Sequence, residues 1–130
     1  MLIAWDPVTQ KERWRTSGGG AVGGGTVTTA GNLVFQVIPD GRFVAYSADK
    51  GEKLSDIQTG LRGGMAPPIT YMLDGKQYVA FLGGQGTVLP PLPNAPPPAA
   101  GAVPGNALAG PTVPPKLLTF VLDGKGTLPK

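Results

Sequence analysis

The sequence predicts an all-β fold, because one short strand pattern recurs along it and no helical period accompanies the many Gly and Pro residues. Residues 2–6 and 43–47 are apolar runs with an aromatic residue near their end, and they align with an offset of 41 residues. Residues 117–121 are a weaker third copy. A period of about 40 to 50 residues with several strands per unit is typical of propeller blades. We therefore predict a partial β-propeller, with about two blades of antiparallel strands plus a closing strand.

A hairpin is expected between the first two copies, over residues 26–36. This β-rich stretch is interrupted by Gly31 and Asn32, which predicts a turn at that point. Residues 33–36 are nearly all apolar, which is typical of a strand that is buried on both faces.

A second hairpin is expected over residues 69–82. The runs 69–73 and 77–82 flank Asp74 and Gly75. An Asp-Gly pair between β-rich runs predicts a tight turn, because both residues tolerate a positive φ.

The composition changes between residues 90 and 115, where ten prolines occur together with Gly, Ala and little charge. This predicts an irregular, polyproline-like excursion before the chain returns to the sheet. The expected organisation is therefore blade segments over 1–89, a Pro/Gly-rich loop over 90–115, and a closing strand and C-terminal tail over 116–130.

The composition also excludes several classes of function. The chain has neither Cys nor His, which excludes disulfides, zinc sites of the usual kind and a Ser-His-Asp triad. Its eleven Lys and Arg residues are scattered, so nucleic acid is not an expected partner. No apolar run is long enough to span a membrane, and residues 1–6 do not have the features of a signal peptide. If the parent protein is secreted, its signal is expected upstream of this chain.

The two stronger strand copies share a longer spacing of residues. The first contains Ala4, Asp6, Gln10 and Trp14, and the second contains Ala45, Ser47, Gly51 and Ser55. This spacing resembles the tryptophan-docking motif Ala-x-Asp-x-x-x-Gly-x-x-x-Trp of the PQQ-dependent (pyrroloquinoline quinone) dehydrogenases. In those propellers the Trp ring fills the gap between neighbouring blades, and its N–H needs a buried acceptor. The second copy has Ser55 in place of Trp, so we expect a looser contact with the following blade.

The order of the segments extends this resemblance over almost the whole chain apart from the proline-rich stretch. The segments that resemble the methanol and ethanol dehydrogenases of this family are residues 2–7, 24–36, 40–46, 68–80 and 117–124. The resemblance implies that the chain is the C-terminal piece of such a quinoprotein, supplying propeller closure. It also implies a periplasmic parent that oxidises primary or secondary alcohols with PQQ and Ca2+ (or a lanthanide), with a cytochrome c as electron acceptor.

In the resembling enzymes the catalytic base, the metal site and most quinone contacts lie in earlier blades, so no catalytic or metal-binding residue is expected in this chain. The matching cofactor segment is the glycine-rich stretch after the strand at 77–82, and its candidate cofactor-binding residues are Gly83, Gly84, Gln85 and Gly86. Gln85 stands where the methanol dehydrogenase type has Trp, and its amide could hydrogen-bond a quinone carbonyl or carboxylate. The alternative is an ordinary glycine-rich exit from a strand.

Two other readings of the chain remain open. PQQ-like propeller repeats also occur in assembly proteins, so the chain could be a non-catalytic interaction or scaffold module. A third reading is a truncated product with no function of its own. In each case two blades are too few to bury a continuous core, so we expect self-association or dependence on the missing blades.

Overall fold

The computed structural model describes residues 1–17, 24–61, 65–84, 114–121 and 124–128, which contain nine strands and no helix. The strands are β1 (Leu2–Asp6), β2 (Lys11–Thr16), β3 (Thr26–Thr29), β4 (Leu33–Val37), β5 (Arg42–Ser47), β6 (Lys53–Gln58), β7 (Ile69–Leu73), β8 (Lys76–Gly83) and β9 (Lys116–Val121). The predicted all-β class is confirmed. Because no helix is present in the described residues, none of them forms a helix that could cross a membrane.

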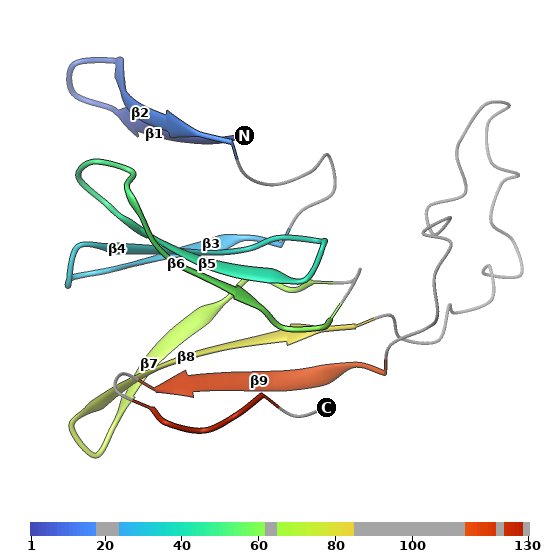
Figure 1. Cartoon of the computed structure of the whole chain (residues 1–130). Helices are drawn as coiled ribbons and strands as arrows, with labels where there is room; N and C mark the ends of the chain where they lie inside the picture. The colour runs from blue at the N-terminus through green and yellow to red at the C-terminus, as the bar shows by residue number, and fades with distance from the viewer. Residues whose placement is uncertain (18–23, 62–64, 85–113, 122–123, 129–130) are drawn as a thin grey trace, which may run out of the picture.

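The strands form three antiparallel sheets, which lie one above another with the second sheet in the middle (Figure 1). The first sheet is β1-β2, the second is β3-β4-β5-β6, and the third is β7-β8-β9. Only the second sheet has the four strands of a complete propeller blade. The closing strand β9 pairs with β8 from Tyr78↔Val121 to Gly83↔Lys116, which confirms the predicted return to the sheet. The predicted excursion over 90–115 lies outside the described residues except for Pro114 and Pro115.

The β7–β8 hairpin has the predicted two-residue turn. Leu73 and Lys76 are direct partners, which leaves Asp74 (φ 49°) and Gly75 (φ 72°) as the two turn residues. Positive φ at both positions is the requirement that an Asp-Gly pair meets.

The β3–β4 hairpin also forms as predicted, with a three-residue turn. Thr29 pairs with Leu33, and Asn32 has a φ of 62°. Asn adopts this conformation more readily than most residues with a side chain. The strand that follows, β4, is at least half-buried along its whole length, as the apolar run predicts.

Two strands were not among those predicted from sequence, β2 and β6. Every second residue of β2 is exposed, and five of the six residues of β6 are exposed. Both strands are rich in charged and polar residues, as their exposure requires. Neither has the apolar run that predicts the other strands. Their pairing with β1 and β5 supplies the hydrogen bonds that their composition does not predict.

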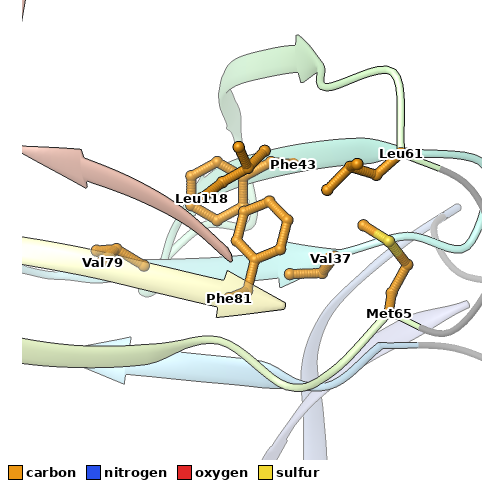
Figure 2. Close-up of a cluster of buried hydrophobic side chains, with 7 residues drawn as sticks. All are labelled: Val37, Phe43, Leu61, Met65, Val79, Phe81 and Leu118. Atoms are coloured by element: carbon orange, nitrogen blue, oxygen red, sulfur yellow. The ribbon is translucent and has the colours of Figure 1, made fainter. Parts of the chain in front are cut away.

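The larger core lies between the second and third sheets. Figure 2 shows its seven buried side chains, which are Val37, Phe43, Leu61, Met65, Val79, Phe81 and Leu118. The aromatic rings connect the two sheets: the ring centroids of Phe43 and Phe81 are 5.0 Å apart, and those of Phe43 and Phe120 are 4.8 Å apart. Such contacts add to the stabilisation from buried area.

A smaller core lies between the first and second sheets. Its buried members are Val34, Ile38, Val44 and Tyr46, and Leu2, Trp14 and Ala48 pack against them. Alternate residues of β4 therefore serve the two cores, with Val34 in the smaller core and Val37 in the larger one. This explains why β4 has the continuous apolar run of a strand between two layers.

Candidate functional site

Trp14 joins the first sheet to the second sheet. Its indole Nε1 donates a hydrogen bond to the carbonyl oxygen of Ala48 at 2.8 Å, although the two residues are 34 positions apart. The ring lies over Gly51, where an added Cβ would be 2.6 Å from two ring carbons of Trp14. Gly51 also has a φ of 71°, a conformation that L side chains rarely adopt. The structure thus confirms the predicted role of Trp14 between neighbouring sheets.

Gln10 of the first copy stands at the motif position that Gly51 holds in the second copy. Gln10 has a φ of 52°, so the turn after β1 needs the same left-handed backbone as the turn after β5. A side chain in this conformation costs free energy that glycine does not. The resemblance to the docking motif is therefore structural as well as sequential.

Ser55 occupies the position in the second sheet that Trp14 occupies in the first. Trp14 pairs with Ala4 across β1 and β2, and Ser55 pairs with Ala45 across β5 and β6. The register also shifts directly after the alanine in both strand pairs. No large side chain projects from position 55 toward the third sheet.

A pocket of about 270 Å³ lies between the second and third sheets at this point. Its walls are mainly apolar, and its lining residues are Leu33, Phe35, Phe43, Ala45, Ser55, Ile57, Gln77, Val79, Phe120, Val121 and Gly124. The pocket lies beside the larger core, to which Phe43 and Val79 belong. The sequence predicted a loose contact here from the absent Trp, and the structure has a pocket there.

The glycine-rich stretch begins at the end of β8. An added Cβ on Gly83 would lie 2.5 Å from the sulfur of Met65, and one on Gly84 would lie 2.7 Å from the carbonyl oxygen of Pro114. Gly84 also has a φ of 113°. Glycine is required at Gly84, where the obstacle is the backbone of Pro114 and φ is positive, whereas the obstacle at Gly83 is the flexible side chain of Met65, which can shift. Gln85 and Gly86, the other two cofactor candidates, lie outside the described residues.

The described carboxylates serve turns and strand surfaces. Backbone N–H groups of Val8 and Thr9 donate to Asp6 at 2.9 and 3.3 Å, and these bonds lower the pKa of Asp6. The Asn32 amide donates to Asp49 at 2.9 Å and lowers its pKa. Within the described ranges no three Asp, Glu, His or Cys residues lie close enough together to hold a metal ion.

Ion pairs lower the pKa of Glu12 on β2 and of Asp56 on β6. The Arg15 guanidinium hydrogen-bonds Glu12 and lowers its pKa, and Lys53 does the same for Asp56 from 2.9 Å. Each pair lies on an exposed strand of its sheet. A general base for catalysis would need a pKa near the operating pH, and these carboxylates are shifted the other way.

Two buried polar atoms have no hydrogen-bond partner among the described residues, Thr29 Oγ1 and Gln36 Oε1. Sequence reasoning did not single out either residue. Thr29 pairs with Leu33 and Gln36 pairs with Thr26, so they lie at opposite ends of the β3–β4 hairpin. They therefore do not form a common polar site.

Comparison with known proteins agrees with this architecture. Residues 2–79 match the family described as PQQ, the glucose/ethanol/alcohol dehydrogenase beta-propeller domain. Quinohemoprotein alcohol dehydrogenase of Comamonas testosteroni is 43% identical over 129 residues, which cover 99% of this chain and 16% of that protein. Its crystal structure superposes with a TM-score of 0.70 at 37% identity, over 99% of this chain and 17% of that one.

Two other relatives give the same picture. Quinohemoprotein alcohol dehydrogenase ADH-IIG of Pseudomonas putida is 53% identical over 85 residues, covering 65% of this chain and 12% of that protein. The 1-butanol dehydrogenase (cytochrome c) of Thauera butanivorans is 41% identical over 128 residues, covering 98% of this chain and 16% of that protein. The chain thus spans less than a fifth of the length of these relatives. The blade-like sheets, the packing of Trp14 on Gly51 and the family match together show that the chain belongs to the β-propeller family of PQQ-dependent glucose, ethanol and alcohol dehydrogenases.

Proposed function

We propose that this chain forms the closing part of the propeller in a PQQ-dependent dehydrogenase that oxidises alcohols. The observation that carries the proposal is the Trp14 indole seated on Gly51 and bonded to Ala48, at the spacing of the family's docking motif. The relatives named as alcohol dehydrogenases support the substrate class, primary or secondary alcohols. The role of this chain is to hold blades in place, since its described carboxylates are turn and surface residues.

PQQ, when bound, accepts the electrons that are removed from the alcohol. Gly83 and Gly84 do not offer an open cradle for it, because Met65 and Pro114 already fill the space where their side chains would be. We retain the stretch from Gly83 to Gly86 as one wall of the quinone site, of which Gln85 and Gly86 lie outside the described residues. A Ca2+ or lanthanide ion would be held by residues elsewhere in the parent, since the described residues contain no suitable cluster.

The missing blades are the proposed partners of this chain. The repeat aligns β1 with β5, which has β4 as a neighbour, but the described part of the chain provides no such neighbour for β1. Likewise β9 corresponds to β5, but the described residues provide no strand on its other side, where β6 would lie. Sheet edges of this kind pair readily with further strands. We assign these two edges as the joints to the rest of the propeller.

Exposed apolar side chains on the faces of the outer sheets indicate further contacts with the missing blades, in addition to the two open edges. Ile3 and Trp5 of the first sheet are 41% and 60% exposed, and Ile69, Tyr71 and Leu73 of the third sheet are 60%, 40% and 53% exposed. Exposed apolar residues gathered in this way mark an interaction surface. In the absence of the other blades, the same surfaces would drive self-association. A periplasmic location and a cytochrome c acceptor complete the proposal, the latter supported by the name of the Thauera relative.

A chimera tests the proposed function. The 129-residue segment of the Comamonas testosteroni enzyme that aligns with this chain is replaced by the chain itself. The purified chimera, loaded with PQQ and Ca2+, is expected to oxidise primary alcohols, whereas the same enzyme with the segment deleted is expected to be inactive.

The chimera also separates the enzyme from the scaffold alternative. A chimera that folds cooperatively and binds PQQ but oxidises no alcohol would contradict a role in a working dehydrogenase. That outcome would favour the non-catalytic interaction module, for which the altered motif at Ser55 is the structural argument.

A further inference from the structure

The two interfaces between sheets differ at one equivalent position. Between the first and second sheets the Trp14 ring fills the space over Gly51, in the turn that follows β5. Between the second and third sheets the equivalent residue is Ser55, and the pocket beside it reaches Val121 and Gly124, at the end of β9 and in the turn after it. Because β9 is the repeat copy of β5, the pocket occupies the place where the ring of a docking tryptophan would lie.

We propose that this pocket is a binding site for a small, uncharged, planar aromatic molecule of about the size of indole. The volume of about 270 Å³ is slightly below the range of pockets that hold drug-sized ligands, so it suits one or two fused rings. The pocket is partly open to solvent, and a small aromatic ring that enters it removes apolar surface of the ring and of the walls from water. The inference is independent of the proposed enzymatic function.

The walls favour a flat ring over a branched aliphatic molecule. Phe35 and Phe43 are stacked with centroids 5.5 Å apart, and Phe43 and Phe120 are stacked with centroids 4.8 Å apart. All three line the pocket. A ring that enters can extend this stack, which is a favourable arrangement for aromatic groups.

Two lining side chains can serve a single polar group on the ligand. Ser55 carries a hydroxyl group at an exposed position of β6. The Nε2 of Gln77 donates to Thr70 Oγ1 at 2.9 Å, so the amide's carbonyl oxygen is the end that can accept from a ligand. None of the described residues that line the pocket is charged. The ligand is therefore expected to carry one N–H or O–H group and no charge.

Titration of the full chain with indole tests the proposal, with methyl resonances of the protein as the readout. We expect saturable shifts for Leu33, Val79 and Val121, with a dissociation constant on the order of 0.1 to 1 mM for so small a ligand. Val34, Ile38 and Val44 form the equivalent interface, which Trp14 already closes, and should not shift. Shifts spread equally over both interfaces, or none at the pocket, would overturn the proposal.

Variants at position 55 give the matched controls. Ser55→Ala should bind indole within about twofold of the unchanged chain, because it leaves the cavity open. Ser55→Trp should weaken binding about tenfold or more, because its own ring occupies the site. If the Ser55→Trp variant does not fold, Ser55→Phe fills the pocket with a smaller ring and replaces it in the test. Unchanged binding in a folded Ser55→Trp or Ser55→Phe variant would show that indole binds elsewhere and would overturn the assignment. Benzenesulfonate, which is planar but charged, should not produce the pocket shifts.

Discussion

The indole Nε1 of Trp14 lies 2.8 Å from the carbonyl oxygen of Ala48, and this hydrogen bond links β2 of the first sheet to the turn after β5 of the second. The ring attached to this nitrogen lies on Gly51 three residues later in the same turn. Together with Leu2, which packs against the same buried residues, this side chain joins two sheets that share no strand.

Shortening Trp14 should separate the ring's contribution from that of the hydrogen bond. Trp14→Phe removes the donor but keeps an aromatic ring, and should lower the free energy of unfolding by about 1 kcal/mol. Trp14→Ala removes the ring as well and should cost about 3 kcal/mol, at the low end for this change because Trp14 is only half-buried. Urea unfolding followed by circular dichroism measures both. Equal losses in the two variants would contradict a role for the ring itself.

The left-handed turns predict opposite effects for two substitutions. Gln10→Gly should stabilise the chain by about 0.5 to 1 kcal/mol, since Gln10 has a φ of 52° that glycine adopts without strain. Gly51→Ala should destabilise it, because the new Cβ meets both the positive φ and the Trp14 ring. Thermal unfolding of the two variants beside the unchanged chain gives the signs. A Gly51→Ala variant as stable as the unchanged chain would rule out the close contact between the Trp14 ring and Gly51.

Filling the pocket should tighten the second interface. Ser55→Trp restores the tryptophan of the docking motif and should raise the free energy of unfolding by about 0.5 to 2 kcal/mol, as cavity-filling substitutions commonly do. Ser55→Ala is the control, with little expected change because it adds no volume. The measurement is again the urea midpoint. No gain in stability from the added ring would count against the equivalence of Ser55 and Trp14.

The Asn32–Asp49 hydrogen bond predicts a dependence on pH. This bond lowers the pKa of Asp49 in the folded chain, so its stabilisation is present above the unfolded pKa of about 3.9 and is lost as the pH falls through the lower folded value. Asn32→Gly removes the amide and keeps the positive φ. The loss of the hydrogen bond should lower the urea midpoint at pH 7 against any gain from the relaxed backbone, so the midpoint of the variant relative to the unchanged chain should rise between pH 7 and pH 3. If the urea midpoints of the variant and the unchanged chain differ by the same amount at both pH values, the effect comes from the backbone of the turn and not from the hydrogen bond.

The sequence was sufficient for the parts of the fold in which local chemistry and burial agree. The largely apolar sequence of β4 predicts a buried strand, and the Asp74-Gly75 pair predicts a tight turn. The motif spacing predicts the position of Trp14 between the sheets. The strands β2 and β6 were missed because their sequences are dominated by solvent-facing residues, and only pairing with β1 and β5 reveals them. The pocket beside Ser55 could be expected only as a loose contact, because its walls come from residues between 33 and 124.

The candidate cofactor residues show a different limit. The family resemblance suggests that Gly83 and Gly84 are glycines because they face the quinone. In the structure, Gly83 instead packs closely against Met65, and Gly84 packs closely against Pro114. A sequence does not distinguish a glycine required by a ligand from one required by a neighbouring side chain. Only the arrangement of the chain around that position makes the difference.

Reconstitution of a split enzyme tests the central claim most directly, namely that these sheets complete a PQQ-dependent propeller. The Comamonas testosteroni enzyme lacking its aligned segment is mixed with this chain, PQQ and Ca2+, and alcohol oxidation is measured alongside size-exclusion chromatography. The two polypeptides should elute together in equal amounts and oxidation should return, with less recovery for the Trp14→Ala chain. Two folded polypeptides that elute separately, with no oxidation of alcohol, would contradict this claim.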